Sequence, residues 1–127
     1  MTGPLQGLRI LDLATVVAGP FASTLLADLG AHVVKVELPD GRDGLRHLPP
    51  HKDGVPLWWK VGNRNKKGVT LDVRTTEGRD LLLRLLPEFD VLVENFRTGT
   101  MDKWGLDAAT LWKANPRLTI LRVTAPS

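Results

Sequence analysis

Short apolar stretches of strand length alternate with longer stretches of helical spacing along the chain. Five of the short stretches are rich in Val, Ile and Leu and predict strands at residues 8–13, 33–36, 68–73, 91–93 and 118–123. Their nearly continuous apolar character is typical of a parallel sheet that helices cover on both faces. The sequence therefore predicts an α/β fold: a Rossmann-like open, mostly parallel five-stranded sheet with flanking helices and right-handed crossovers.

The first predicted helix covers residues 20–29. It begins at a Gly-Pro pair, places Phe21, Leu25 and Leu29 four residues apart, and ends before Gly30, where a positive φ costs little. The regular spacing of three large apolar side chains is what predicts the helix.

Two further helices are predicted from their ends. Thr75 caps a helix over residues 76–86 that ends at Pro87. A third helix begins at Asp107, whose carboxylate is expected to accept hydrogen bonds from the first free amides, and ends before Pro116. Strands and helices thus alternate along the chain.

A long connection, residues 38–67, separates the second and third predicted strands. It holds several prolines and glycines and, at residues 57–60, an apolar and basic segment that predicts one helical turn. Connections of this length are usually functional or disordered.

Composition fits one soluble globular domain spanning residues 1–127, with 43% hydrophobic residues and no Cys. The lack of Cys excludes disulfides and favours a cytoplasmic location, and we expect no membrane segment. The net charge is only +3, but one stretch is strongly basic, with Asp72 as its single acidic residue. The cations of this stretch are Lys60, Arg64, Lys66, Lys67 and Arg74.

Several common site motifs are missing. The turn after the first strand has one glycine instead of G-x-G-x-x-G, so an NAD site of the usual kind is not expected, and there is no P-loop. His47 and His51 lack further ligands, so no metal is assigned. A triad of Ser23, His32 and Asp12 is discounted because no nucleophile elbow presents the serine, and Asp12 is expected to bond neighbouring backbone instead.

The segment of residues 58–67 mixes two tryptophans with cations. Such a mixture can stack on a base and pair with phosphates, so either a nucleic acid or a nucleotide-bearing cofactor is a candidate partner. The alternative interpretation is a tryptophan pair that covers the sheet edge, with the lysines in solvent.

The chain closely resembles the N-terminal part of the family III CoA-transferases (CaiB/BaiF type). Each matching block is weak alone, but their shared order is specific. The blocks lie at residues 4–13, 18–20, 26–31, 34–37, 63–72, 76–78, 90–99 and 115–118. The segment of residues 58–67 favours the transferase branch over the acyl-CoA racemase branch.

The resemblance implies an activity that needs more than these 127 residues. Family members move CoA between an acyl-CoA and a free carboxylic acid through an aspartyl intermediate. The resemblance places that aspartate beyond Ser127, so this truncated chain is expected to be inactive alone and to contain no catalytic residue. Complete members form homodimers, whereas the state of this chain stays open.

The resemblance also implies which residues bind CoA, without metal or NAD. Three strand ends and one later cation are involved: Val17, Ala18, Leu71, Asp72, Val73, Arg74, Asn95, Phe96, Arg97 and Lys103. The cations among them suit phosphate. Leu38 departs from the family pattern, which often has Arg there, and Arg42 is the expected substitute.

Overall fold

A computed structural model describes residues 3–41 and 43–124. One sheet contains five strands: β1 (Arg9–Asp12), β2 (His32–Glu37), β5 (Lys66–Thr70), β6 (Val91–Glu94) and β7 (Thr119–Arg122). Their order is β5-β2-β1-β6-β7, and every neighbouring pair is parallel. The predicted Rossmann-like parallel sheet is confirmed, and the strand order reverses between β1 and β6.

The three predicted helices are present as α1 (Ala18–Asp28), α3 (Thr76–Leu85) and α5 (Ala108–Ala114). Two more are α2 (Leu57–Gly62), at the predicted helical turn, and α4 (Thr100–Lys103), which was not predicted. The 3-10 helices are η1 (Gly44–His47) and η2 (Leu86–Glu88). In the described ranges no helix is both long and apolar enough to cross a membrane.

The ends of α3 and α5 differ in how far they follow the prediction. The Thr75 hydroxyl accepts a hydrogen bond from the Gly78 amide at 3.0 Å, as expected of a cap. Asp107 precedes α5 as predicted, but its carboxylate accepts from the Thr110 hydroxyl at 2.5 Å and makes no capping bond to a helix amide. The Asp107 carboxylate thus bonds the side chain of Thr110, whereas a backbone amide of the first turn was expected.

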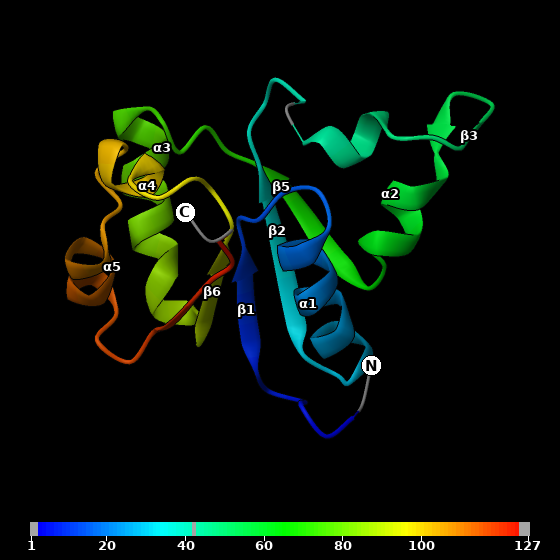
Figure 1. Cartoon of the computed structure of the whole chain (residues 1–127). Helices are drawn as coiled ribbons and strands as arrows, with labels where there is room; N and C mark the ends of the chain where they lie inside the picture. Colours follow the sequence, from blue (N-terminus) through cyan, green and yellow to red (C-terminus); the bar gives the residue numbers. More distant parts are fainter. Residues whose placement is uncertain (1–2, 42, 125–127) are drawn as a thin grey trace.

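Helices cover the sheet from two sides, which we call the α1 face and the α3 face. Figure 1 shows α1 lying over β1 and β2, while α3, α4 and α5 gather beside β6. The α3 face is built from large apolar side chains: Leu11, Leu13, Val36, Val73, Leu82, Leu86, Phe89, Leu92, Met101, Leu106, Leu111 and Leu118. The α1 face has a smaller core of Ile10, Ala14, Ala27, Ala31, Val33 and Val93.

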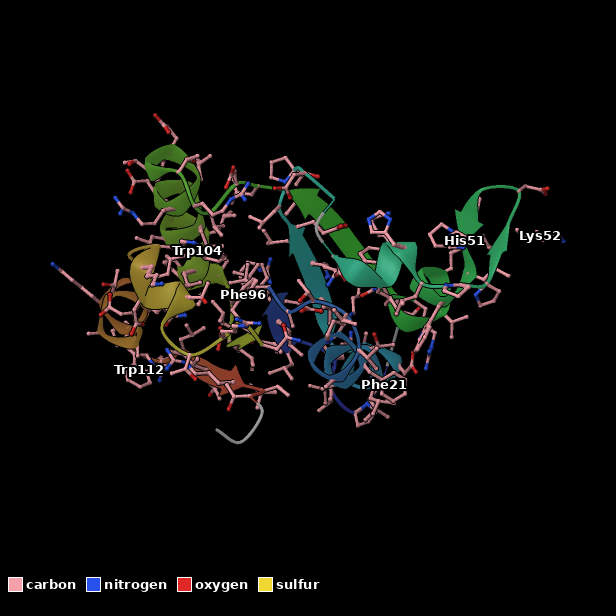
Figure 2. All side chains as sticks on the ribbon, turned by 45° about the horizontal axis from the view of Figure 1, so that its top comes forward. Phe21, His51, Lys52, Phe96, Trp104 and Trp112 are labelled. Carbon is pink, nitrogen blue, oxygen red and sulfur yellow. The ribbon has the colours of Figure 1, made fainter. Side chains whose placement is uncertain are left out.

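Helix α1 turns the apolar side chains whose spacing predicted it away from the sheet. Phe21, Leu25 and Leu29 are each 46–47% exposed, and Figure 2 shows Phe21 on the outer side of the helix. The residues that α1 buries are small or polar, among them Ser23 and Thr24. The spacing that predicted the helix therefore does not mark its buried face.

The third strand lies earlier in the chain than predicted, at residues 66–70 instead of 68–73. As an edge strand, β5 is mostly exposed, so burial on both faces does not apply to it. Val73 is buried in the core of the α3 face, but it lies beyond the last strand residue. The apolar run therefore reflects core contacts made after the strand ends.

The connection at residues 38–65, here called the arm, contains more regular structure than the single predicted turn. It holds η1, a hairpin of β3 (His51–Lys52) and β4 (Val55–Pro56), and α2. The hairpin turns at Asp53 and Gly54, both with positive φ, the conformation that an Asp-Gly pair favours. Figure 2 places His51 and Lys52 at the outer end of the arm.

Candidate functional site

The crevice between β1 and β6 lies where the strand order reverses, and ligands of open α/β sheets bind at such a point. Asn95, just after β6, spans this crevice. Its side-chain oxygen accepts from the Thr15 amide at 2.8 Å, and its amide group donates to the Thr15 carbonyl at 2.6 Å. The predicted CoA contact Asn95 therefore also has a structural role, because it ties the two strand ends together.

The turn from β1 into α1 carries the predicted contacts Val17 and Ala18, which are both exposed. Gly19 makes this turn tight, since a Cβ there would lie 2.5 Å from the Ala14 Cβ and 3.6 Å from Asn95. Within the described residues, no side chain caps the N-terminus of α1. Pro20 has no N–H, and the Phe21 amide donates to the Val17 carbonyl. The uncapped amides at the start of this 11-residue helix are therefore those of Ala18 and Gly19. The positive end of the helix dipole at this point favours an anionic group.

A small cavity of about 30 Å³ opens beside this turn. The predicted residues Leu71, Val73 and Phe96 line it, together with Leu38 and the buried Asp43. These residues come from three different connections, so the fold does bring part of the predicted set together. The cavity is far smaller than the roughly 300–1,000 Å³ of typical small-molecule pockets, so a CoA-sized ligand would lie across the surface.

Arg74 is already paired with carboxylates. Its guanidinium contacts Asp72 at 2.8 Å and Asp40 at 3.1 Å. The hydrogen bond with Asp72 is the main cause of a raised pKa for Arg74. Two carboxylates therefore offset the charge that was expected to face a phosphate.

Arg97 and Lys103 are the more available cations of the predicted set. Both are exposed, and neither forms an ion pair among the residues that the structure describes. Glu94, three residues before Arg97, is buried and lies 3.7 Å from Arg122. Phe96 packs edge-on against Trp104, with ring centroids 4.9 Å apart, which fixes α4 and its Lys103 beside the end of β6 (Figure 2).

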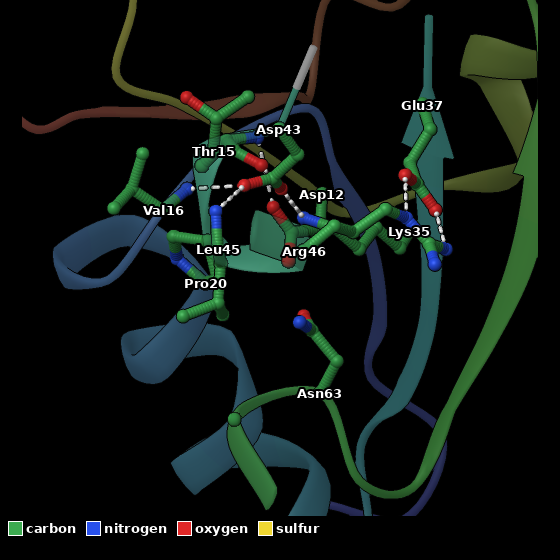
Figure 3. A network of polar contacts seen from close by, with 12 residues as sticks. Asp12, Thr15, Val16, Pro20, Lys35, Glu37, Asp43, Leu45, Arg46 and Asn63 are labelled. Atoms are coloured by element: carbon green, nitrogen blue, oxygen red, sulfur yellow. Dashed lines mark hydrogen bonds and ion pairs between the residues drawn. The ribbon is translucent and has the colours of Figure 1, made fainter. Parts of the chain in front are cut away.

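A buried ionic network lies under the β1–α1 turn (Figure 3). Asp12 accepts from Lys66 at 2.8 Å and from Ser23 at 2.6 Å, and both charged side chains are at most 2% exposed. Lys35 donates to the Ala14 carbonyl at 2.7 Å and lies 3.5 Å from Asp43. Burial is the main cause of a lowered pKa for Lys66, which Asp12 opposes.

Sequence reasoning found only part of this network. Asp12 was expected to bond neighbouring backbone, and it does accept from the Ala14 amide at 2.9 Å. Its partner Lys66 was instead assigned to a solvated or ligand-binding surface. A signal for Lys35 was present, since a lone lysine inside an apolar strand needs a buried partner.

In the segment of residues 58–67, several of the tryptophans and cations contact other residues of the chain. Lys66 is buried against Asp12, and Arg64 pairs with Asp28 at 2.6 Å. Trp59 stacks under the Arg46 guanidinium at 3.8 Å. These contacts remove Lys66, Arg64 and one tryptophan from the predicted cationic surface.

Other candidates can now be placed. His32 lies at the amino end of β2, paired with Arg9, whereas Asp12 lies at the other end of β1, so the discounted triad does not assemble. Within residues 3–41 and 43–124 no group of three His, Cys, Asp or Glu side chains could hold a metal ion. Arg42, the expected substitute for a missing contact at Leu38, lies outside the described residues.

Comparison with known proteins decides the family. The model of CoA-transferase family III matches residues 5–125. The chain belongs to this family. A succinyl-CoA–L-malate CoA-transferase beta subunit of Chloroflexus aurantiacus is 50% identical over 97% of the chain, and a succinyl-CoA–D-citramalate CoA-transferase of the same organism is 48% identical over 95%. The chain spans 31% and 30% of the lengths of these two relatives.

Solved structures agree with this family assignment. A CAIB/BAIF family protein from Brucella suis superposes with a TM-score of 0.89 at 42% identity, over 98% of this chain and 34% of that protein. The β1–α1 turn, the strand ends and the arm therefore belong to the fold that the family III CoA-transferase resemblance implied.

Proposed function

We propose that this chain is the CoA-binding part of a CoA-transferase that moves CoA between an acyl-CoA and a free carboxylate. Under this proposal the 127 residues form one domain that binds CoA without a metal or NAD. The observation that carries the proposal is the set of exposed groups around the crevice between β1 and β6. Exposed cations and uncapped helix amides lie at the edge where ligands of such sheets bind. The relatives named above, which are CoA-transferases, favour this activity over racemisation.

The phosphates of CoA are proposed to lie near Arg97, Lys103 and the N-terminus of α1. Arg97 and Lys103 have no carboxylate partner among the described residues, so a phosphate gains their full charge. Arg74 contributes less, because Asp72 and Asp40 already hold its guanidinium. The apolar parts of the ligand are proposed to lie over the cavity next to Phe96.

The covalent chemistry is proposed to use an aspartate outside this sequence. Its carboxylate would attack the thioester to form an anhydride and release CoA thiolate. The thiolate would then attack the aspartyl carbonyl of the anhydride, which forms an enzyme thioester and releases the donor's acyl group as a free carboxylate. Asp12 is unsuited to such attack, because it is fully buried between Lys66 and Ser23. We therefore expect CoA binding, but no transfer, from this chain alone.

Calorimetric titration of CoA into the wild type and Arg97→Ala tests the site. Loss of a charge-assisted phosphate contact should weaken binding about tenfold. Lys52→Ala is the matched control: this exposed lysine lies at the end of the arm, and its loss should leave the affinity unchanged.

Two outcomes would contradict the proposal. Equal affinities of the wild type and Arg97→Ala would remove the phosphate site. Binding that depends on the exposed Trp58 and Lys60 but not on Arg97 would move the site to the arm, and a steep loss of nucleic-acid binding with salt would then favour a nucleic-acid partner.

A further inference from the structure

The β1–α1 turn contains a residue in a strained backbone conformation. Val16 has a φ of +66°, in the left-handed region that β-branched side chains rarely adopt. It directly precedes Val17 and Ala18, the exposed residues that are proposed to meet CoA. A conformation of this kind persists only when surrounding contacts hold it in place.

Three polar side chains hold three consecutive residues of this turn. Lys35 donates to the Ala14 carbonyl at 2.7 Å, and Asn95 bonds both backbone groups of Thr15. The Asp43 carboxylate accepts from the Val16 amide at 2.9 Å, as Figure 3 shows. The strained residue is thus held by the arm, which is more than twenty residues away in sequence.

Asp43 is itself firmly placed. Its Oδ1 also accepts from the Leu45 amide at 3.1 Å, its side chain is 2% exposed, and the Lys35 ammonium lies 3.5 Å from Oδ2. Within the described residues Oδ2 has no hydrogen-bond partner, so the ion pair is its main compensation for burial. The carboxylate therefore has one oxygen for the two amides and one for the lysine.

We propose that Asp43 is a positioning residue for CoA binding. It holds Val16 in the left-handed conformation and so fixes the backbone of Val17 and Ala18 in the form that receives CoA. The inference rests on the proposed function, because it assigns the turn as part of the CoA site. Without Asp43, the turn relaxes to other conformations, and the apparent affinity falls in proportion to the fraction of molecules that keep the binding form.

The test compares CoA affinities of variants by calorimetric titration. Asp43→Ala should weaken binding about tenfold, since relief of such strain favours the relaxed turn by roughly that factor. Asp43→Asn keeps an oxygen that accepts from the Val16 amide and should retain most of the affinity. Adding Val16→Gly to Asp43→Ala should restore binding, because glycine adopts positive φ without strain.

Asn115→Ala is the matched control for lost stability. Asn115 is another buried polar residue, which donates to the Leu86 and Phe89 carbonyls on the α3 face. Its loss should lower the melting temperature but leave CoA affinity unchanged, with or without Val16→Gly. If Asp43→Ala and Asn115→Ala weaken binding equally, or if Val16→Gly restores nothing, Asp43 acts only through stability and the proposal is wrong.

Two further measurements keep the proposal testable if Asp43→Ala does not fold or if the wild type binds no CoA. If Asp43→Ala does not fold, Val16→Gly is compared with Val16→Gly/Asp43→Ala: equal affinities support the proposal, and a tenfold loss overturns it. A strong intraresidue HN–Hα Overhauser effect marks positive φ at Val16 without any ligand. It should weaken in Asp43→Ala and persist in Asp43→Asn, so its persistence in Asp43→Ala overturns the inference even if the wild type binds no CoA.

Discussion

The two faces of the sheet are stabilised in different ways. On the α3 face, large aliphatic side chains such as Leu82 and Leu92 are fully buried, as in an ordinary apolar core. On the α1 face, the central strands carry the buried charges Asp12 and Lys35, and the covering helix contributes small or polar residues. The same sheet is thus packed by a large apolar core on one side and by a smaller apolar core together with paired polar groups on the other.

The difference between the two faces explains where the strained turn lies. Apolar packing is not directional, so it cannot hold a particular backbone amide in place. Hydrogen bonds and ion pairs are directional, and on the α1 face they meet at the turn after β1, where Val16 adopts its unusual conformation. A polar face is therefore suited to a site that needs a fixed backbone.

The largest expected effect comes from breaking the central ion pair of the α1 face. Asp12→Ala should lower the free energy of unfolding by about 3–5 kcal/mol, because it leaves the buried Lys66 ammonium without its carboxylate. Urea denaturation of the 127-residue chain measures this loss.

The double variant Asp12→Ala/Lys66→Met is the control for this prediction. Since no unpaired charge remains buried, it should be more stable than the sum of the two single losses implies. Additive losses would mean that Asp12 stabilises the fold only through neutral contacts such as that with Ser23.

The sequence predicted regular elements better than their environments. The strands and the helix after Thr75 follow from local patterns that the structure confirms, and so does the parallel arrangement of the sheet. The exposed stripe of α1 and the buried ion pairs could not be predicted in this way. Asp12 and Lys66 are 54 residues apart, so their contact depends on how β1 and β5 are placed in the sheet.

For the candidate site, the sequence predicted which strand ends lie together, but not which of the site residues pair with one another. The carboxyl ends of the strands do gather Leu71, Val73 and Phe96 around one cavity, as the parallel topology favours. Sequence reasoning treated Arg74 as equivalent to Arg97, although Asp72, one of the two partners of Arg74, lies only two residues away. The other partner, Asp40, lies in a different connection and leaves no local signal. Asp43 was missed because its partner amide lies in a distant turn.

A smaller effect is expected from the buried acid on the α3 face. Burial is the main cause of a raised pKa for Glu94, and Arg122, 3.7 Å away and 44% exposed, only partly opposes it. The folded state therefore keeps a proton that the unfolded chain loses near pH 4.5. Stability from this group is present below that pH and is lost as the pH rises through the raised pKa.

Glu94→Gln should remove this pH dependence. We expect the unfolding free energy of the wild type, relative to Glu94→Gln, to fall as the pH rises from about 4 to 7 in urea titrations. Arg122→Met should extend the fall to higher pH, because it removes the cation that opposes the raised pKa of Glu94. A difference that stays constant with pH would show that Glu94 ionises normally in the fold.

The smallest effect is expected on the outer side of α1. Leu25→Gln should change the free energy of unfolding by no more than about 0.5 kcal/mol, because Leu25 is 47% exposed and glutamine is a good helix former. The same substitution at Leu82, fully buried on α3, should cost about 2–5 kcal/mol and serves as the matched control. Urea denaturation of both variants gives the comparison directly. Similar losses at the two positions would mean that the apolar stripe of α1 contributes as much to stability as the core does. The hydrogen bonds from Ser23 to Asp12 of β1 and from Thr24 to the Gly62 carbonyl of α2 would then not be what holds this helix in place.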